Sequence, residues 1–592
     1  MFLVSRTVLL TGISAAFLGL SHSTDHAKYQ VSSPAPIPGV ICGQAQPRMM
    51  ALPRNYQVAL ASMNMLSVAS ADGSIPLIPG LDKVGLPITT KSSKAQQYFN
   101  QGLALTYGFN HEGAIRSFRA AQALDPNCAM CFWGEAYAHG PNINAPMDSL
   151  ANAKAISAAQ QAMKLRDQAT AWERDLIAPI AVRYADGEAD RPALDLAYAK
   201  AMQQAAAAHP ENDDIAVLAA EAIMDTRPWD YWEADRKTPK GDIGTAIQMV
   251  ETVMSRTPNH PQAIHLYIHL MEASATPERG EAPADRLAKP LMPGAGHFVH
   301  MPAHLYHVLG RYSDSINANI AAAKADEDWL SKTSDSGIYR YGYYPHNVHF
   351  IITAAQLGGD KATALNQSAK LRGILGVDVA ILLPWVQVIY AAPYFAHAQF
   401  SSPAEILAQP APDERLPYAT AMWHYARAVA AALKNDAATV ESEISAMRNI
   451  RTNVDFQSMV SAGVPATDLI ELAEEVAFGR IAYAQRRFAD ASEHFTRATV
   501  IEDRMPYMEP PYWYYPVRQS LGAAQLAMGQ PDAARLSFMA ALARAPNNGW
   551  ALYGLAESQR QMNDRPAMRG TRAALDKAWL GSDRSALRLI RL

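Results

Sequence analysis

Several features that would decide the class of this protein are scarce in its 592 residues. Three cysteines are too few for a disulfide-built scaffold. The 52 Lys and Arg residues against 56 Asp and Glu residues leave a net charge of −4, which offers no basic surface for nucleic acid. No uncharged apolar run of membrane-spanning length follows the first residues. We therefore expect a soluble globular protein with no nucleic-acid partner and no stable membrane insertion.

Familiar catalytic signatures are missing as well. The chain has no Gly-x-Ser-x-Gly elbow and no phosphate-binding Gly-x-x-x-x-Gly-Lys loop. The glycine turn at residues 294–296 lacks the preceding strand that a dinucleotide site requires. Any chemistry must therefore come from other residue types.

The N-terminus has the pattern of an export signal. Arg6 precedes an apolar run over residues 8–20, and the small residues Ser21 and Ser23 suit a cleavage site. We predict a signal peptide at residues 1–23 and a periplasmic or secreted location. Repeated prolines predict an extended, loop-rich arm over residues 24–93.

From Lys94 onward, small and aromatic residues recur at fixed spacing. Small residues let two helices of a hairpin approach closely, an aromatic residue fills the gap, and a proline ends the second helix. Two stretches show the spacing in full: Gly102, Ala114, Phe118, Ala121, Pro126 and Gly522, Ala534, Phe538, Ala541, Pro546. The chain resembles the tetratricopeptide-repeat family from about Lys94 almost to its end. The resemblance implies an all-α, tetratricopeptide-like solenoid, which we divide into residues 94–260, a histidine-rich segment 261–360, and residues 361–592.

Histidine is abundant in the middle segment. Nine of the 17 histidines lie between residues 260 and 349. Two groups repeat the spacing i, i+4 and i+7, and a third pair has the spacing i and i+3, so each group shares one helix face. The members of this set are His265, His269 and Glu272, then His300, His304 and His307, then His346 and His349.

These histidines should meet if their helices are successive inner helices of a solenoid, which lie about 10 Å apart. We expect His265, His269, His304 and His307 to point into one cavity with His346 or His349. Such nitrogen ligands suit copper or zinc, with iron also possible. Glu272 would be a ligand or a general base. His260 and His297 are expected in turns and are weaker candidates.

Other interpretations of the histidines remain open. A histidine pocket could bind an anionic or aromatic ligand, and single helical histidines are often structural. Cys128 and Cys131 favour a local disulfide in an exported protein, with packing cysteines or a soft metal pair as alternatives. Cys42 is left over in the arm.

A longer sequence pattern points to a narrower group. The segment from Gly294 to Tyr306 contains His-Met-Pro-Ala-His-Leu-Tyr, and residues 125–135, 141–144 and 509–513 carry further shared motifs. The chain resembles exported bacterial tetratricopeptide-repeat proteins of the His-Met-Pro-x-His-x-Tyr type. The resemblance supports the architecture and names no reaction.

Two functions from different classes follow. The first is an exported metalloprotein with a small-molecule substrate in the solenoid groove, a metal-dependent oxidoreductase or hydrolase, of which the oxidoreductase is slightly favoured. The second is a scaffold that binds a peptide or protein partner without catalysis.

Overall fold

The computed structural model describes residues 75–592 except residues 83, 188–189, 290 and 336. The predicted signal peptide, Cys42 and most of the predicted arm lie outside the described residues. All described residues belong to one compact unit. Within it the chain is an all-α, tetratricopeptide-like solenoid without strands, which confirms the predicted fold class. None of the described helices is both long and apolar enough to cross a membrane.

The N-terminal helices run from the end of the arm to the histidine-rich segment. They are α2 (Ser93–Tyr107), α3 (His111–Leu124), α4 (Ala129–Ala138), α5 (Asn152–Leu165), α6 (Ala171–Ile177), α7 (Arg191–Ala208), α8 (Asp213–Asp225) and α9 (Ile243–Arg256).

The middle helices carry the histidines. They are α10 (Pro261–Glu272), α11 (Glu281–Leu287), α12 (Gly296–His300), α13 (Pro302–Val308), α14 (Tyr312–Lys332), the π-helical turn η5 (Tyr339–Tyr343), and α15 (Tyr344–Gly358).

The C-terminal helices complete the array. They are α16 (Lys361–Ile374), α17 (Val377–Leu382), α18 (Val386–Phe400), α19 (Pro403–Leu407), α20 (Pro417–Leu433), α21 (Ala437–Asn453), α22 (Gln457–Ser461), α23 (Ala466–Ala484), α24 (Phe488–Asp503), α25 (Arg518–Ala527), α26 (Pro531–Arg544), α27 (Gly549–Gln561) and α28 (Arg565–Ala578).

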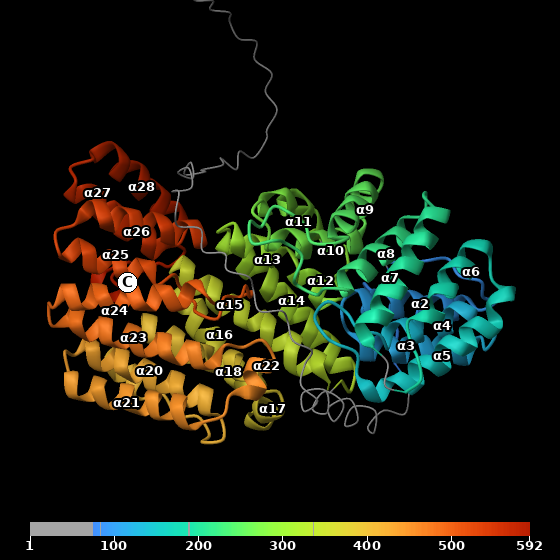
Figure 1. The fold of residues 1–592 in the computed structure, drawn as a ribbon, viewed down its shortest axis with the longest axis horizontal. Coiled ribbons are helices and arrows are strands. Elements are labelled where there is room, and N and C mark those ends of the chain that lie inside the picture. Colours follow the sequence, from blue (N-terminus) through green and yellow to red (C-terminus); the bar gives the residue numbers. More distant parts are fainter. Residues whose placement is uncertain (1–74, 83, 188–189, 290, 336) are drawn as a thin grey trace, which may run out of the picture. The chain divides into compact units, whose positions relative to one another are not determined.

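Helices that follow one another in the chain pack against one another, as in a repeat array. α20 pairs with α21, α23 with α24, α25 with α26, and α27 with α28 (Figure 1). Each pair also contacts the next, so each repeat buries the apolar face of its neighbour.

The glycine and phenylalanine positions of the repeat explain this packing. A Cβ placed on Gly522 or Gly554 would lie 2.9 or 2.1 Å from the ring of Phe538. Phe118 lies in the same way against Gly102 and Gly134. The phenylalanine of one hairpin therefore fills the space left by a glycine in its own hairpin and another in the next.

The described part of the arm is loop, and it packs onto the first hairpin. Leu81 and Leu86 are buried. The Ile78 N–H donates to Gln101 Oε1 at 2.7 Å, and the Tyr98 hydroxyl donates to the carbonyl of Ile75 at 2.9 Å.

The buried apolar residues form two clusters. One extends from Ile75 to Tyr339 and the other from Tyr312 to Leu592. They meet around α14 and α15, so the histidine-rich segment has no separate core and lies where the two clusters join.

Candidate metal centre

Three helical segments bring the histidines together. α10 starts at Pro261, whose missing N–H suits the first turn of a helix. α12 and α13 are nearly continuous: only Met301 separates them, and Pro302 is the first residue of α13. α15 follows the turn η5 and also carries a proline in its first turn. Histidines three or four residues apart on each segment therefore share a face.

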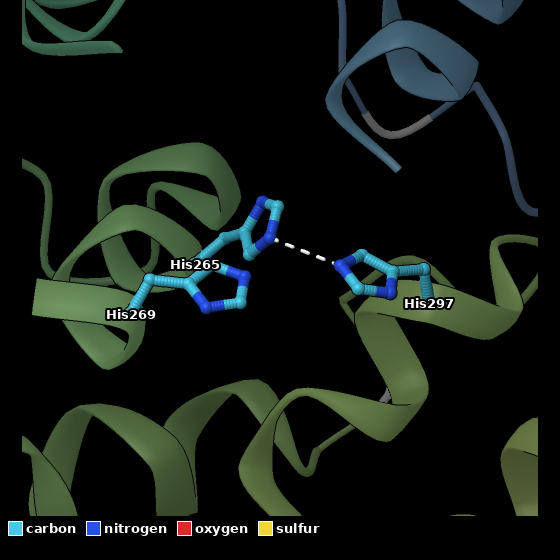
Figure 2. A group of neighbouring side chains, drawn as sticks. All are labelled: His265, His269 and His297. Atoms are coloured by element: carbon cyan, nitrogen blue, oxygen red, sulfur yellow. Dashed lines mark hydrogen bonds between the residues drawn. The ribbon is translucent and has the colours of Figure 1, made fainter. Parts of the chain in front are cut away.

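The first group contains His265 and His269 of α10 and His297 of α12. Each of the three buried side chains offers a ring nitrogen, and these nitrogens lie within 4.8 Å of one another. The Nε2 atoms of His265 and His297 are 3.2 Å apart. In Figure 2 the rings of His265 and His269 come from one helix and face His297 on another. We call this group the first triad.

The second group contains His300, His304 and His346, from α12, α13 and α15. Its ligand atoms also lie within 4.8 Å of one another, and we call it the second triad. The Nε2 atoms of His300 and His304 are 2.8 Å apart. His300 and His304 are buried, whereas His346 is partly exposed.

The two triads are neighbours. The ring centres of His269 and His304 are 5.5 Å apart, and those of His297 and His300 are 5.8 Å apart. Rings of the two triads are therefore in contact with each other.

Glu272 is hydrogen-bonded to one histidine ring of each triad. Its Oε1 lies 2.7 Å from Nδ1 of His269, and its Oε2 lies 2.7 Å from Nδ1 of His304. The side chain is fully buried. Burial alone would raise its pKa, but the hydrogen bonds and charge interactions with His304 and His269 lower the pKa to about 2. Glu272 is therefore an ionised acceptor that fixes the Nδ1–H tautomer of both rings.

Neutral amide groups orient two further rings. His300 Nδ1 lies 2.6 Å from Asn319 Oδ1, and the Asn319 amide N–H donates to the Ser315 carbonyl, which fixes the amide orientation. His265 Nδ1 lies 3.0 Å from Gln262 Oε1. The Gln262 amide in turn donates to Glu221 at 3.2 Å.

These contacts leave nitrogen lone pairs without a donor. With both Nδ1 atoms protonated, the Nε2 atoms of His300 and His304 face each other as two acceptors. The Nε2 of His269 and the Nδ1 of His297 are buried without a hydrogen-bond partner. Unpaired buried acceptors are rare in folded proteins.

Burial favours the neutral form of five of the triad rings. It lowers the pKa of His265, His297, His300 and His346, and the neighbouring imidazoles lower it further. Burial also lowers the pKa of His269, although Glu272 acts in the opposite direction. Neutral imidazole is the form that binds a metal.

Aromatic side chains enclose the triads. The Phe109 ring lies 4.8 Å from the ring of His297, and the Trp229 ring lies 5.2 Å from that of His269, centre to centre. Phe350 lies 4.9 Å from His300. The loop between α24 and α25 also reaches the site, where the Tyr507 hydroxyl donates to Glu272 Oε2 at 3.3 Å. The motif at residues 509–513 belongs to this loop, but nothing in the sequence indicated that the loop lies beside the histidines.

The structure therefore distributes the expected residues differently from the single predicted cavity. Five of the seven candidate ligands lie in two triads rather than in one group: His265, His269, His300, His304 and His346.

His307 and His349 lie outside the triads. The His307 ring packs against Tyr312 and Phe350, and His349 Nε2 lies 2.9 Å from the Tyr514 hydroxyl. His307 lies three residues beyond His304, and His349 three residues beyond His346. Each ring is therefore nearly one turn further along its helix than the triad, where it meets Tyr312 or Tyr514 instead.

His297 corrects the sequence interpretation in the opposite direction. It was expected in a turn, but it belongs to α12, one turn before His300. The i, i+3 spacing of His297 and His300 was the available signal. His260 is structural, since its Nδ1 caps α10 by accepting the Ala263 N–H.

Cys128 and Cys131 form a disulfide at the start of α4. This confirms the favoured interpretation from the sequence. The alternative of a soft metal pair is wrong.

Comparisons with known proteins add little to this picture. No family model matches the sequence, and no curated protein matches it. Solved structures similar to it include a human IFIT1 dimer with m7Gppp-AAAA, with 11% identity, a TM-score of 0.31, and coverage of 89% of this chain and 95% of that chain. Yeast Tom70 has 10% identity, a TM-score of 0.27, and coverage of 82% and 93%. At such TM-scores the fold assignment rests on the helix pairs described above.

Proposed function

We propose that this protein is an exported metalloprotein with a dinuclear transition-metal centre, one ion in each histidine triad. The carrying observation is the facing pair of Nε2 atoms in His300 and His304. Both Nδ1 atoms already donate to acceptors, so a cation between or beside the two Nε2 atoms removes their repulsion.

The first triad supports a second ion. His269 Nε2 has no partner, while its Nδ1 is held by Glu272. A carboxylate behind a ligating histidine is the usual arrangement around protein-bound metals, because it fixes the ring and raises its basicity. We therefore propose Glu272 as a positioning residue for both ions, in place of the ligand or base role considered from the sequence.

The chemistry of the ligands favours copper. All six are imidazoles, and no thiolate or carboxylate belongs to either triad. Imidazole suits copper, zinc, iron and nickel, and copper binds a given nitrogen site most tightly among the divalent first-row metals. Copper would supply oxidation of an organic substrate by dioxygen, so we propose an oxidoreductase.

Access is proposed on the side of the second triad, because His346 is its only partly exposed member. The buried Phe109 ring and the partly exposed Trp229 ring beside the first triad would limit the access of bulk water to that ion.

The test is metal analysis by mass spectrometry on protein purified without a histidine tag. We expect two copper ions per chain. His265→Ala should remove the ion of the first triad, and His346→Ala that of the second. His307→Ala is the matched control, since His307 lies beside the second triad but outside it, and should retain both ions.

The outcomes separate the parts of the proposal. A content of two zinc ions per chain would support the dinuclear centre but refute the proposed oxidation chemistry. A single ion lost in both variants would refute the division into two triads. Protein without metal after incubation with copper or zinc would refute the centre itself.

A further inference from the structure

A second polar site lies among the C-terminal helices, away from the histidines. A small pocket, partly open to solvent, is lined by residues from α15, α18, α20, α23 and α25. The loop at residues 505–517 and the chain near residue 591 complete it. Its polar lining consists chiefly of Gln356, Tyr425, Arg480, Tyr515, Gln519 and Arg591.

Two guanidinium groups share this pocket without a carboxylate. Arg480 donates to the Ile590 carbonyl at 3.4 Å and to the Tyr515 hydroxyl at 3.1 Å. Arg591 donates to the carbonyls of Gln399 and Ser401. No acidic residue lines the pocket, and within the described chain neither arginine has an ion-pair partner.

The two charges act on each other. Burial lowers the pKa of Arg591, and the neighbouring Arg480 lowers it further. Two partly buried cations that repel each other raise the energy of the folded state unless an anion lies between them.

One buried hydrogen-bond donor of the pocket has no acceptor within the described chain. The Nε of Arg480 is buried without a partner. Gln519 is 1% exposed, and its Oε1 accepts from Asn548, whose own oxygen accepts the Trp550 N–H. Gln519 lines the pocket, and its Oε1 is the atom used by this network.

The remaining wall is apolar, from Phe395, Ala398 and Val429. We propose that this pocket binds a small oxyanion, a carboxylate or phosphate group, through Arg480, Arg591 and Gln519. The planar fork of a guanidinium matches both groups with paired hydrogen bonds, and an anion would neutralise the repulsion between the two arginines. The site is independent of the metal centre, since it shares no residue with either triad.

The experiment is calorimetric titration of the full chain with sodium phosphate, sodium acetate and sodium chloride at constant ionic strength. We expect phosphate or acetate to bind the native protein. Arg480→Gln and Arg591→Gln should each weaken binding at least about tenfold, because each removes charge-assisted hydrogen bonds.

Arg569→Gln is the matched control, since Arg569 is exposed on α28, and should leave binding unchanged. Arg591→Gln decides the test if Arg480→Gln disturbs folding through Tyr515, and circular dichroism checks this. Binding of phosphate alone or of acetate alone would identify the preferred oxyanion, and either result would support the site. Equal binding of chloride, no binding of any salt, or binding unaffected by both substitutions would overturn it.

Discussion

The substitution Glu272→Gln tests the metal centre at the residue that the two triads share. Glu272 accepts two imidazole N–H groups at 2.7 Å from a fully buried position. Glutamine keeps the shape but has one oxygen, so its NH₂ group must face one of the two Nδ1–H groups. That ring then turns over or changes tautomer, which places a hydrogen on the nitrogen needed by the metal.

The expected magnitude follows from these two contacts. A hydrogen bond to a charged partner contributes about 1.5–3 kcal/mol, and loss of the partner behind a ligating histidine weakens metal binding roughly 10–100-fold. Because glutamine can still accept from one ring, we expect one of the two ions to bind with that loss and the other to bind nearly as before.

The assay is competition for copper against a chelator of known affinity, followed by metal content per chain. Glu278→Gln serves as the control, because Glu278 is an exposed residue of the turn after α10. Two ions bound with unchanged affinity in Glu272→Gln would refute the reasoning that this carboxylate fixes both rings.

Two further substitutions test the packing and the electrostatics of the scaffold. Gly554→Ala should destabilise the protein by about 1–3 kcal/mol in urea unfolding, because its Cβ would lie 2.1 Å from the Phe538 ring, whereas Gly570→Ala, with open space around it, should be neutral or stabilising. An unchanged stability in Gly554→Ala would contradict the close packing. Burial alone would raise the pKa of Glu135, but the His139 ring 3.7 Å away, the Arg119 charge, and hydrogen bonds from Gln122 and Arg119 lower it to about 2. The stability from this depressed pKa is present above the ordinary value of 4.5 and is lost as the pH falls towards 2. Glu135→Gln should therefore lower the free energy of unfolding by roughly 2 kcal/mol at pH 7, allowing for the exposure of Arg119, and by less at pH 3. Equal losses of stability at both pH values would argue against this.

Sequence periodicity predicted the repeat architecture because the repeat is a local unit. Gly102 and Phe118, or Gly522 and Phe538, are 16 residues apart in one hairpin, and each hairpin needs only its neighbours to bury its apolar face. The pair His265 and His269 could be predicted for the same reason, since helix geometry alone places residues four apart on one face.

The sequence could not divide the histidines into two triads. Residues within one helix set only the direction of each ring, whereas the meeting of rings depends on how α10, α12, α13 and α15 cross. The short helix α12 places His297 in the first triad, and the rise along α13 and α15 carries His307 and His349 past the second triad.

Residues that complete both sites come from distant parts of the chain. Tyr507 reaches Glu272 across 235 positions, and Arg591 approaches Arg480 from the last turn of the described chain. Such pairings depend on the packing of many intervening repeats. The sequence by itself therefore determined the helical repeat and the helix faces rich in histidine. Only the tertiary structure decided which faces meet, because small rotations add up from one repeat to the next.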